Sequence, residues 1–319
     1  MAGDGAAIGR ATAVVVAWNS GGLAVEQLTA LEPAFAAGMR MVLLDNGSVD
    51  GSFEWMAAFL HDWPHAAHVD LARSDANLGF CAGVNFCVER ALAAEPPPDY
   101  IWMLNPDARV SDSTARELVR ALEESHEGIA SPAGDGPVHF AVDAWPRAFW
   151  APDRFWVAHT PPNRAWWPAG RYKGSCAMFD AGLVRRLIER FGEFQDSGFF
   201  MDADEWETTL RARALGRGVV LARDAVEDHP GGWRTLAPTR LSEARQYYQS
   251  RNLVVAGRRW IPGWKFWPLL GARIVVNCSW FMRMRLKGHK PHERAYFTGL
   301  FDGLRGRTGR WSRHPRANR

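Results

Sequence analysis

Cysteines are few in this chain, and their spacing excludes two common kinds of small scaffold. The four cysteines form no Cys-x-x-Cys pair and no zinc-ligand spacing; they are Cys81, Cys87, Cys176 and Cys278. The sequence therefore predicts neither a disulfide framework nor a zinc site, and it suits a reducing compartment such as the cytoplasm. With 319 residues, 47% of them hydrophobic, the chain is long enough to bury one large core and carry an appendage.

The sequence also lacks a strong excess of charge of either sign. The formal net charge is only +3, and Lys and Arg form no long tract before the C-terminal region, so we expect no nucleic-acid partner. The N-terminus, Met1-Ala-Gly-Asp-Gly, lacks a basic segment followed by an apolar one, and nothing there predicts secretion. The glycines of 77–85 match neither a GxGxxG nor a Walker pattern, which argues against a dinucleotide dehydrogenase and a P-loop NTPase.

What the sequence does contain is a series of short apolar runs, each followed by polar residues. Runs of this length predict buried strands; they span 11–18, 41–44, 69–72, 100–104, 173–179 and 219–221. Amphipathic stretches between them predict helices at 23–31, 86–94, 113–124 and 183–191. This alternation predicts an α/β fold, in which ligands bind beyond the carboxyl ends of the strands.

The central predicted strand, Tyr100 to Leu104, is followed directly by Asn105-Pro106-Asp107. A carboxylate there, just past a proline that fixes the backbone, can bind a hard divalent cation together with water and diphosphate oxygens. The alternative is an ordinary turn, because Asn-Pro-Asp is common turn chemistry. We take Asp107 as a metal ligand because of the motifs that accompany it.

Two other loops also follow predicted strands. Asp45, directly at a strand end, is predicted to contact a base or ribose, whereas Asp50 in the same loop is equally well explained as a helix cap. In the next loop, Gly79 allows the backbone to approach a ligand closely, and the amides of Asn77 and Asn85 suit sugar or phosphate.

The order and spacing of these motifs resemble the family 2 glycosyltransferases over most of the chain. The matching motifs are Trp18-Asn19, Asp45-Asn-Gly-Ser-Val-Asp50-Gly, Asn77-Leu-Gly-Phe, Leu104-Asn-Pro-Asp107, Gly174-Ser175, Phe199-Phe200, Asp204-Glu205, His229 and Arg251-Asn252. More narrowly, the chain resembles the rhamnosyltransferase-type branch, in which Asn-Pro-Asp stands in for Asp-X-Asp. The resemblance implies a GT-A fold, Rossmann-like with a mostly parallel central sheet and flanking helices. It also implies sugar transfer from a nucleotide diphosphate with inversion, assisted by Mg²⁺ or Mn²⁺.

The resemblance implies roles for individual residues as well. Asp107 and His229 would hold the metal, and one carboxylate of the Asp204-Glu205 pair would take the proton from the acceptor hydroxyl. The family usually has Glu-Asp here with the second residue as base, so we take Glu205 as the base and Asp204 as the alternative; helix capping would also explain both. Donor-binding residues are expected at Trp18, Asn19, Asp45, Asn77, Gly79, Asn85, Asn105 and Arg251. The Gln-X-X-Arg-Trp motif of processive members is missing, so we expect addition of a single sugar.

The segment 135–171 is rich in tryptophan; it contains Trp145, Trp150, Trp156, Trp166 and Trp167. Aromatic rings suit the C–H faces of sugars, so we predict an acceptor-side surface here, formed by Trp145, Trp166 and Trp167. The alternative is that these rings fill a core under a long irregular loop. Gly174 and Ser175, small residues at the start of the next strand, are placed on the same acceptor side.

The C-terminal region, residues 233–319, is predicted to be helical and distinct from a catalytic domain of residues 1–232. Its tryptophans, Trp260, Trp264, Trp267 and Trp280, alternate with aliphatic and basic residues. Two interpretations are open: a helix lying at a membrane interface, or a helical cap packed on the catalytic domain. The basic tail from Arg305 to Arg319 is expected to be loose.

The sequence thus predicts a metal-dependent glycosyltransferase with a nucleotide-sugar donor, dTDP-rhamnose or a UDP-sugar, and a carbohydrate, lipid-linked or small-molecule acceptor. One alternative is a sugar-nucleotide nucleotidyltransferase, but this class needs a basic glycine-rich N-terminal loop that 14–22 lacks. Another is a non-catalytic sugar-binding protein. A cytoplasmic location, a peripheral contact with the inner face of the cell membrane, and a homodimer are further hypotheses.

Overall fold

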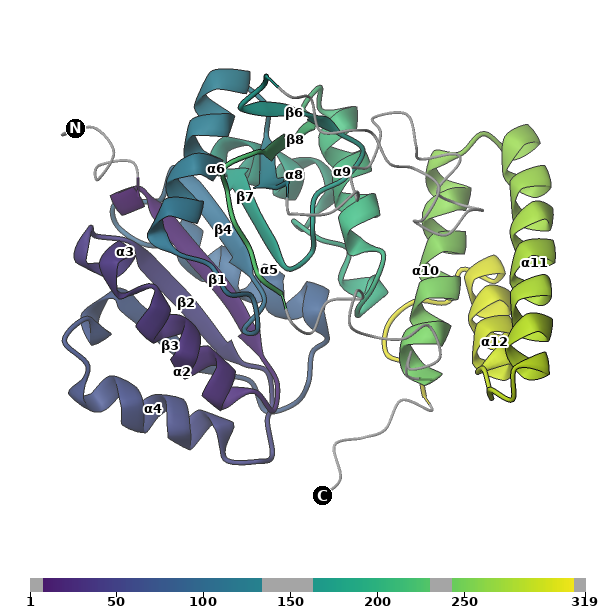
Figure 1. The fold of residues 1–319 in the computed structure, drawn as a ribbon, viewed down its shortest axis with the longest axis horizontal. Coiled ribbons are helices and arrows are strands. Elements are labelled where there is room, and N and C mark those ends of the chain that lie inside the picture. The colour runs from purple at the N-terminus through teal and green to yellow at the C-terminus, as the bar shows by residue number, and fades with distance from the viewer. Residues whose placement is uncertain (1–7, 134–162, 230–242, 313–319) are drawn as a thin grey trace.

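The computed structural model describes residues 8–133, 163–229 and 243–312 (Figure 1). Eight strands form one sheet in the order β3-β2-β1-β4-β7-β5-β8-β6. Their bounds are β1 (Ala11–Ala17), β2 (Arg40–Asp45), β3 (Val69–Arg73), β4 (Tyr100–Leu104), β5 (Ile129–Pro132), β6 (Trp166–Ala169), β7 (Cys176–Asp180) and β8 (Val219–Ala222). Four of the seven pairings are parallel, and the antiparallel ones are β4–β7, β5–β7 and β6–β8. The mostly parallel α/β sheet that the sequence predicts is confirmed.

Helices cover both faces of the sheet (Figure 1). The core on one face includes residues of α2, α3, α4 and α6, and the core on the other face includes residues of α5, α8 and α9. The helix bounds are α2 (Gly21–Ala30), α3 (Glu32–Ala36), α4 (Ser52–Asp62), α5 (Phe80–Leu92), α6 (Asp112–Ser125), α8 (Ala181–Phe191) and α9 (Asp204–Ala214), with 3₁₀ turns η1 (Ala66–His68) and η3 (Ser197–Phe199).

The central strands are apolar throughout because both of their faces are covered. Along β1, Val15 packs in one core and Val14 in the other, and along β4, Trp102 and Met103 divide in the same way. Side chains of a strand alternate between its faces, so a strand buried on both sides reads as a continuous apolar run. This is why the sequence predicts these strands well.

Two predicted boundaries are wrong, and two strands were not predicted. Helix α5 begins at Phe80 rather than Phe86, because Gly79, with a φ of +88°, turns the chain before it. Strand β7 begins at Cys176 rather than Lys173. Strand β6 lies inside the predicted irregular segment 135–171, and the sequence analysis missed it together with β5; both have four residues, too few for a periodic pattern.

Three C-terminal helices, α10 (Glu243–Trp260), α11 (Gly263–Leu286) and α12 (Glu293–Leu304), lie together beyond α9 (Figure 1). The predicted domain boundary between 232 and 233 lies outside the described residues. The loose tail is a wrong prediction as far as 312, because Trp311 is buried and its ring stacks on Tyr247 with centroids 4.4 Å apart. In the described ranges, no helix is both long enough and apolar enough to cross a membrane.

Candidate active site

The carboxyl ends of the parallel strands bring the predicted donor-binding segments to one edge of the sheet. In the register of these strands, Ala17 lies opposite Asp45 and Val15 lies opposite Leu104. The residues that follow each strand therefore meet at the same edge, as the position of ligands in open α/β sheets requires. The structure thus brings Trp18, Asp45 and Asn105 to one side of the fold.

The loop after β1 is fastened to the loop after β2. The backbone N–H of Asn19 donates to Ser48 Oγ at 2.8 Å, and Asn19 Oδ1 accepts from the N–H of Val49 at 3.1 Å. Trp18 remains 40% exposed, so its ring is accessible for stacking against a base. The side chain of Asn19, in contrast, is already engaged in the hydrogen bond from Val49.

Asp45 is a buried carboxylate whose hydrogen-bonding capacity is unused. Its side chain is fully buried, and neither carboxylate oxygen accepts a hydrogen bond within the described residues. In the part of the chain that the structure describes, Asp45 is ion-paired with Arg73, whose Nε lies 3.3 Å from Oδ2. A buried acceptor without a donor is costly. Its position and its unmet acceptors suit the N–H of a base or a ribose hydroxyl.

The loop at 77–79 is locked by side-chain amides. Asn46 Oδ1 accepts from the N–H of Leu78 at 2.9 Å, and Asn77 Oδ1 accepts from the N–H of Gly79 at 2.8 Å. A Cβ on Gly79 would lie 2.6 Å from the Phe200 ring. Glycine is therefore needed for packing at this position, where the loop lies directly against Phe200.

Asn85 is also engaged within the protein. It lies on α5, where its amide donates to the carbonyl of Gln195 at 2.8 Å and accepts from the N–H of the same residue at 2.9 Å. These two bonds fasten α5 to the segment that precedes α9. The donor contacts of Asn77 and Asn85 stay predictions. In the structure, both side chains form hydrogen bonds within the protein.

Asp107 and His229 come together although 122 positions separate them in the sequence. His229 Nε2 lies 3.0 Å from Asp107 Oδ1, and the two side chains are 23% and 29% exposed. Burial alone would raise the pKa of the Asp107 carboxyl, but the hydrogen bond and charge of His229 outweigh it, and this pKa is lowered. Burial alone would lower the pKa of His229, but Asp107 raises it. The pairing that the family resemblance implies is thus present in the structure.

Main-chain hydrogen bonds position this pair. The backbone groups of Arg109 and Asp228 bond to each other in both directions, at 2.8 and 3.0 Å. Gln27 adds support from α2, since its amide donates to the carbonyls of Asn105 and Ala108 at 2.8 and 3.1 Å. The turn that carries Asp107 is therefore held by the backbone and by one buried glutamine that the sequence analysis missed.

The pair suits a shared divalent cation. Ligand atoms at neighbouring corners of an octahedron with bonds of about 2.1 Å are roughly 3.0 Å apart, which matches the Asp107 Oδ1 to His229 Nε2 distance of 3.0 Å. A carboxylate and an imidazole together suit Mn²⁺, and the carboxylate suits Mg²⁺. The described residues include no group of three or more His, Cys, Asp or Glu side chains placed to hold a metal, so these two would share a cation with donor oxygens and water.

The acidic motif lies in a turn with unusual backbone angles. We call residues 200–205 the acid turn. Phe200, Asp202 and Ala203 have φ values of +65°, +64° and +65°, a region that residues other than glycine rarely adopt and that costs about 1–3 kcal/mol each. Helix α9 starts immediately afterwards, at Asp204. Strain concentrated here indicates that the surroundings hold the turn in a particular shape.

Glu205 reaches across to the segment before β7. Arg171 Nη1 donates to Glu205 Oε1 at 2.8 Å, and the two side chains are 11% and 20% exposed. A Cβ on Gly174 would lie 3.2 Å from Glu205 Cγ, so the glycine lets this carboxylate lie close to the backbone. The predicted residues Gly174 and Glu205 are thus neighbours, and Arg171 is a partner that the sequence analysis missed.

Asp204 is more deeply placed than Glu205. It is 5% exposed, and its Oδ2 has no hydrogen-bond partner among the described residues. Burial, and next the charge of Glu205, raise the pKa of Asp204 well above its usual range. Burial also raises the pKa of Asp202 despite the ion pair of its Oδ1 with Arg245 Nε at 3.0 Å. Three carboxyl groups thus crowd one turn.

Two consecutive residues of α10 donate hydrogen bonds to main-chain carbonyls in the acid turn and just before it. The buried amide of Asn252 donates to the carbonyls of Phe199, Met201 and Asp202 at 3.0, 2.7 and 2.8 Å. Arg251 donates to the carbonyls of Gly198 and Phe199, at 3.0 and 2.8 Å. The predicted donor contact of Arg251 stays a prediction, because its guanidinium is occupied with the main chain. Asn252 is a further residue that the sequence analysis did not assign; a polar Arg-Asn pair inside an otherwise packed helix was its only signal.

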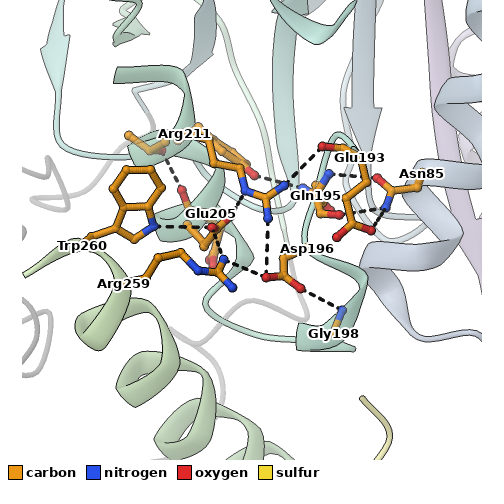
Figure 2. Close-up of polar contacts among 12 residues, drawn as sticks. Asn85, Glu193, Gln195, Asp196, Gly198, Glu205, Arg211, Arg259 and Trp260 are labelled. Carbon is orange, nitrogen blue, oxygen red and sulfur yellow. Dashed lines mark hydrogen bonds and ion pairs between the residues drawn. The ribbon is translucent and has the colours of Figure 1, made fainter. Parts of the chain in front are cut away.

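A buried ionic network links α9 to α10. Figure 2 shows Arg211 between Glu193, whose carbonyl accepts at 3.2 Å, and Asp196, whose carboxylate lies 3.5 Å away. Arg211 also pairs with Glu207 at 2.6 Å, and Arg259 of α10 pairs with both Asp196 and Glu207. Removing one partner of such a network leaves a buried charge uncompensated, so the network fixes α9, the helix that begins at Asp204.

The acceptor-side tryptophans are only partly described. Trp145, Trp150 and Trp156 lie outside the described residues. Trp166 Nε1 donates to Glu124 Oε2 at 3.2 Å, and Trp167 is 4% exposed in the core. Ser175 is 9% exposed, and its carbonyl accepts from the N–H of Asn105 at 2.9 Å. This bond joins the segment before β7 to the Asn105-Pro106-Asp107 turn, while the sugar contacts of these residues stay predictions.

Comparisons with known proteins agree with this arrangement. The model of a family described as "Glycosyl transferase family 2" matches residues 12–186. Comparison with curated proteins finds no significant match. Among solved structures, the mannosyltransferase PcManGT from Pyrobaculum calidifontis in complex with GDP-Man and Mn²⁺ has a TM-score of 0.56 at 18% identity, over 92% of this chain and 80% of that one.

Two further structures are similar at lower identity. TarS residues 1–349 from S. aureus, in complex with UDP-GlcNAc, gives a TM-score of 0.53 at 12% identity, over 93% of this chain and 81% of that one. GalNAc-T7 with UDP, GalNAc and Mn²⁺ gives 0.58 at 12% identity, over 93% of this chain and 57% of that one. Likeness at this level of identity concerns the fold alone.

Proposed function

Because the chain belongs to glycosyl transferase family 2, we propose that it transfers a single sugar, with inversion, from a nucleotide-diphosphate sugar to an acceptor hydroxyl. The chain is a glycosyltransferase, and its fold is the GT-A fold that the sequence predicts. The observation that carries the finer proposal is the chain of contacts that joins the Asp107–His229 pair to the Asp204-Glu205 pair. The turn that carries Asp107, the partner of His229, is bonded through the N–H of Asn105 to the carbonyl of Ser175 at 2.9 Å, and the neighbouring Gly174 lies against Glu205.

Binding of the donor would use the strand-end residues. The unused acceptors of Asp45 would receive the N–H of the base, and the exposed ring of Trp18 could stack on it. Asp107 and His229 would hold Mg²⁺ or Mn²⁺, which supplies positive charge to the leaving diphosphate. The similar structures with GDP-Man, UDP-GlcNAc and UDP support a nucleotide-sugar donor, and two of them contain Mn²⁺.

Transfer itself needs a base on the opposite side of the sugar. The acceptor oxygen would attack the anomeric carbon while the bond from that carbon to the diphosphate oxygen breaks. The acceptor proton would pass to Glu205, which lies closer to solvent than Asp204 and faces Gly174. Arg171 would orient the Glu205 carboxylate through the 2.8 Å hydrogen bond. Asp204, more buried, is the alternative base.

A panel of nucleotide sugars tests the proposal. Purified protein would be incubated with dTDP-rhamnose, UDP-sugars and GDP-mannose, each with Mn²⁺, with Mg²⁺ and with EDTA, and release of nucleoside diphosphate would be measured. Slow hydrolysis of one donor, dependent on the metal, is the expected result. A rise in melting temperature with that donor is also expected, since a hundredfold excess over the Kd stabilises by roughly 2.7 kcal/mol. No release and no thermal shift with any donor would contradict the proposal.

A further inference from the structure

Helix α11 has apolar side chains on two opposite sides. On its inner side, Phe266, Leu270 and Phe281 are buried in the core shared with α10 and α12. Its outer side also displays large apolar residues, namely Trp264, Trp267, Val275, Met282 and Leu286, with exposed fractions of 75, 59, 65, 63 and 81%. A helix that covers only a core needs one apolar side, so the second side requires another explanation.

The exposed residues form one continuous stripe. Trp264, Val275 and Met282 are separated by 11 and 7 residues, close to three and two turns of an α-helix. Trp267 lies within the stripe, three residues after Trp264, and Leu286 extends it at the C-terminal end, four residues after Met282. We call these five residues the α11 outer face. In Figure 1, α11 lies at the edge of the molecule farthest from the sheet.

Positive charge surrounds the α11 outer face. From Ile261 to His292 the chain has six Lys and Arg and no Asp or Glu, and three of the four lysines of the whole chain lie there. Lys265 lies 4.8 Å from the Trp264 ring centroid, and Lys287 and Lys290 are exposed just after the helix. The stretch therefore combines exposed tryptophans and exposed aliphatic residues with an excess of cations, of which Arg285 pairs with Glu293 just beyond it.

We propose that the α11 outer face binds the surface of an anionic phospholipid bilayer. Tryptophan rings are favoured at the boundary between headgroups and acyl chains, and exposed apolar residues with flanking Lys and Arg are the composition of interfacial helices. Each cation near an anionic leaflet adds about 1 kcal/mol of attraction. The proposal stands apart from the sugar and base of the donor, because it rests on α11 alone.

A second copy of the chain is the other possible occupant of this face. A symmetric pairing through the α11 outer face would bring two strongly basic stretches together, and like charges at an interface oppose binding. An anionic lipid surface complements the same charges. The charge pattern therefore favours lipid.

Co-sedimentation with vesicles tests the proposal. The full chain would be mixed with vesicles of phosphatidylcholine alone and of phosphatidylcholine with phosphatidylglycerol. We expect binding to the anionic vesicles, weakening as salt is added, and little binding to phosphatidylcholine alone. Equal binding to both vesicle types, or binding to neither, would overturn the proposal.

Three variants assign the binding to the α11 outer face. Trp264→Ser combined with Met282→Ser should lower vesicle affinity about tenfold or more, because exposed apolar contacts are removed without touching the inner core. Lys287→Glu combined with Lys290→Glu should also lower it about tenfold, for anionic vesicles only. The matched control is Trp55→Ser on α4, where the tryptophan is 62% exposed; its affinity should not change.

Circular dichroism and melting temperature would confirm that each variant is folded. The proposal fails if Trp264→Ser with Met282→Ser binds anionic vesicles as the wild type does, or if Trp55→Ser loses as much affinity. It also fails if the α11 variants abolish a dimer, seen by analytical ultracentrifugation, while vesicle binding is unaffected.

Discussion

The two halves of the candidate active site are held by different kinds of contact. In the donor half, the Asp107–His229 pair is positioned by strand ends and by main-chain hydrogen bonds between Arg109 and Asp228. In the base half, the acid turn depends on buried side chains of α10, above all Asn252. The donor half should therefore tolerate changes in neighbouring side chains, whereas the acid turn should not.

The strongest effect is expected at Glu205, the proposed base. Glu205→Gln keeps the shape of the side chain but removes its basicity, so kcat should fall about 10²–10⁴-fold while donor affinity is retained. Asp204→Asn should be milder in kcat. Steady-state kinetics and donor titration would measure the two quantities separately. Near-normal turnover in Glu205→Gln would move the role to Asp204, and loss of donor affinity in both variants would place the pair in the donor site.

Asn252 tests whether α10 positions the base. Asn252→Ala removes the amide donor to the carbonyls of Met201 and Asp202, and one of the donors to Phe199. A small displacement of a catalytic group can cost about 10²-fold. We expect kcat to fall about 10- to 100-fold, with donor affinity in Mn²⁺ unchanged.

The matched control is Ser250→Ala, which removes a buried hydroxyl that donates to carbonyls of Tyr247 and Tyr296 away from the turn. Both variants should lose roughly 1–3 kcal/mol of stability, measured by urea unfolding. Equal kcat in the two variants would show that Asn252 only stabilises the fold.

Asp204 allows a test of whether a buried carboxylate in the acid turn lowers the stability of the fold. Its pKa is raised by burial and by Glu205, so the folded protein binds this proton more tightly than the unfolded chain. Stability is then lost as pH rises from the unfolded pKa of about 3.9 through the raised folded pKa. Asp204→Asn removes that loss and should raise the melting temperature at neutral pH by about 2–4 °C, the equivalent of about 1 kcal/mol.

The gain should shrink as pH is lowered toward 4, because the folded wild-type carboxyl is then protonated and only about half of the unfolded chains are ionised there. Differential scanning calorimetry across pH would follow it. A lower melting temperature for Asp204→Asn at neutral pH would mean that the Asp204 carboxylate stabilises the turn instead.

The smallest effect is expected at Arg109. Its side chain pairs with Asp228 at 3.3 Å, but both side chains are 67% exposed, and such exposed pairs contribute about 0–1 kcal/mol. Arg109→Ala keeps the backbone hydrogen bonds to Asp228, so metal-dependent donor affinity should change by less than about threefold. A larger loss in a titration would show that the side chains, rather than the main chain, hold the donor half.

The same comparison explains what sequence alone could predict. The donor half follows from local pattern: apolar runs of 11–18, 41–44 and 100–104 end in polar residues, and parallel strands bring those ends together. The base half depends on partners distant in sequence. Nothing near Asn252 indicates that it caps carbonyls around residue 200, and Phe200 shows no local signal for a positive φ.

Short or context-dependent elements were missed for a similar reason. Strands β5 and β6 have four residues each and exist because β8 lies between them. The segment from Arg305 reads as a basic tail, yet Trp311 docks on Tyr247. Pairing and docking of this kind are decided by tertiary contacts that composition does not encode.

The central proposal is that Asp107 and His229 share a divalent cation. Isothermal titration of UDP and dTDP into the wild type and into Asp107→Asn, each with Mn²⁺ and with EDTA, tests it. The wild type should bind at least one of the two nucleotides much more tightly with Mn²⁺ than with EDTA, and Asp107→Asn should bind it equally weakly in both. Full Mn²⁺-dependent affinity in Asp107→Asn would show that the metal lies elsewhere and would contradict the account.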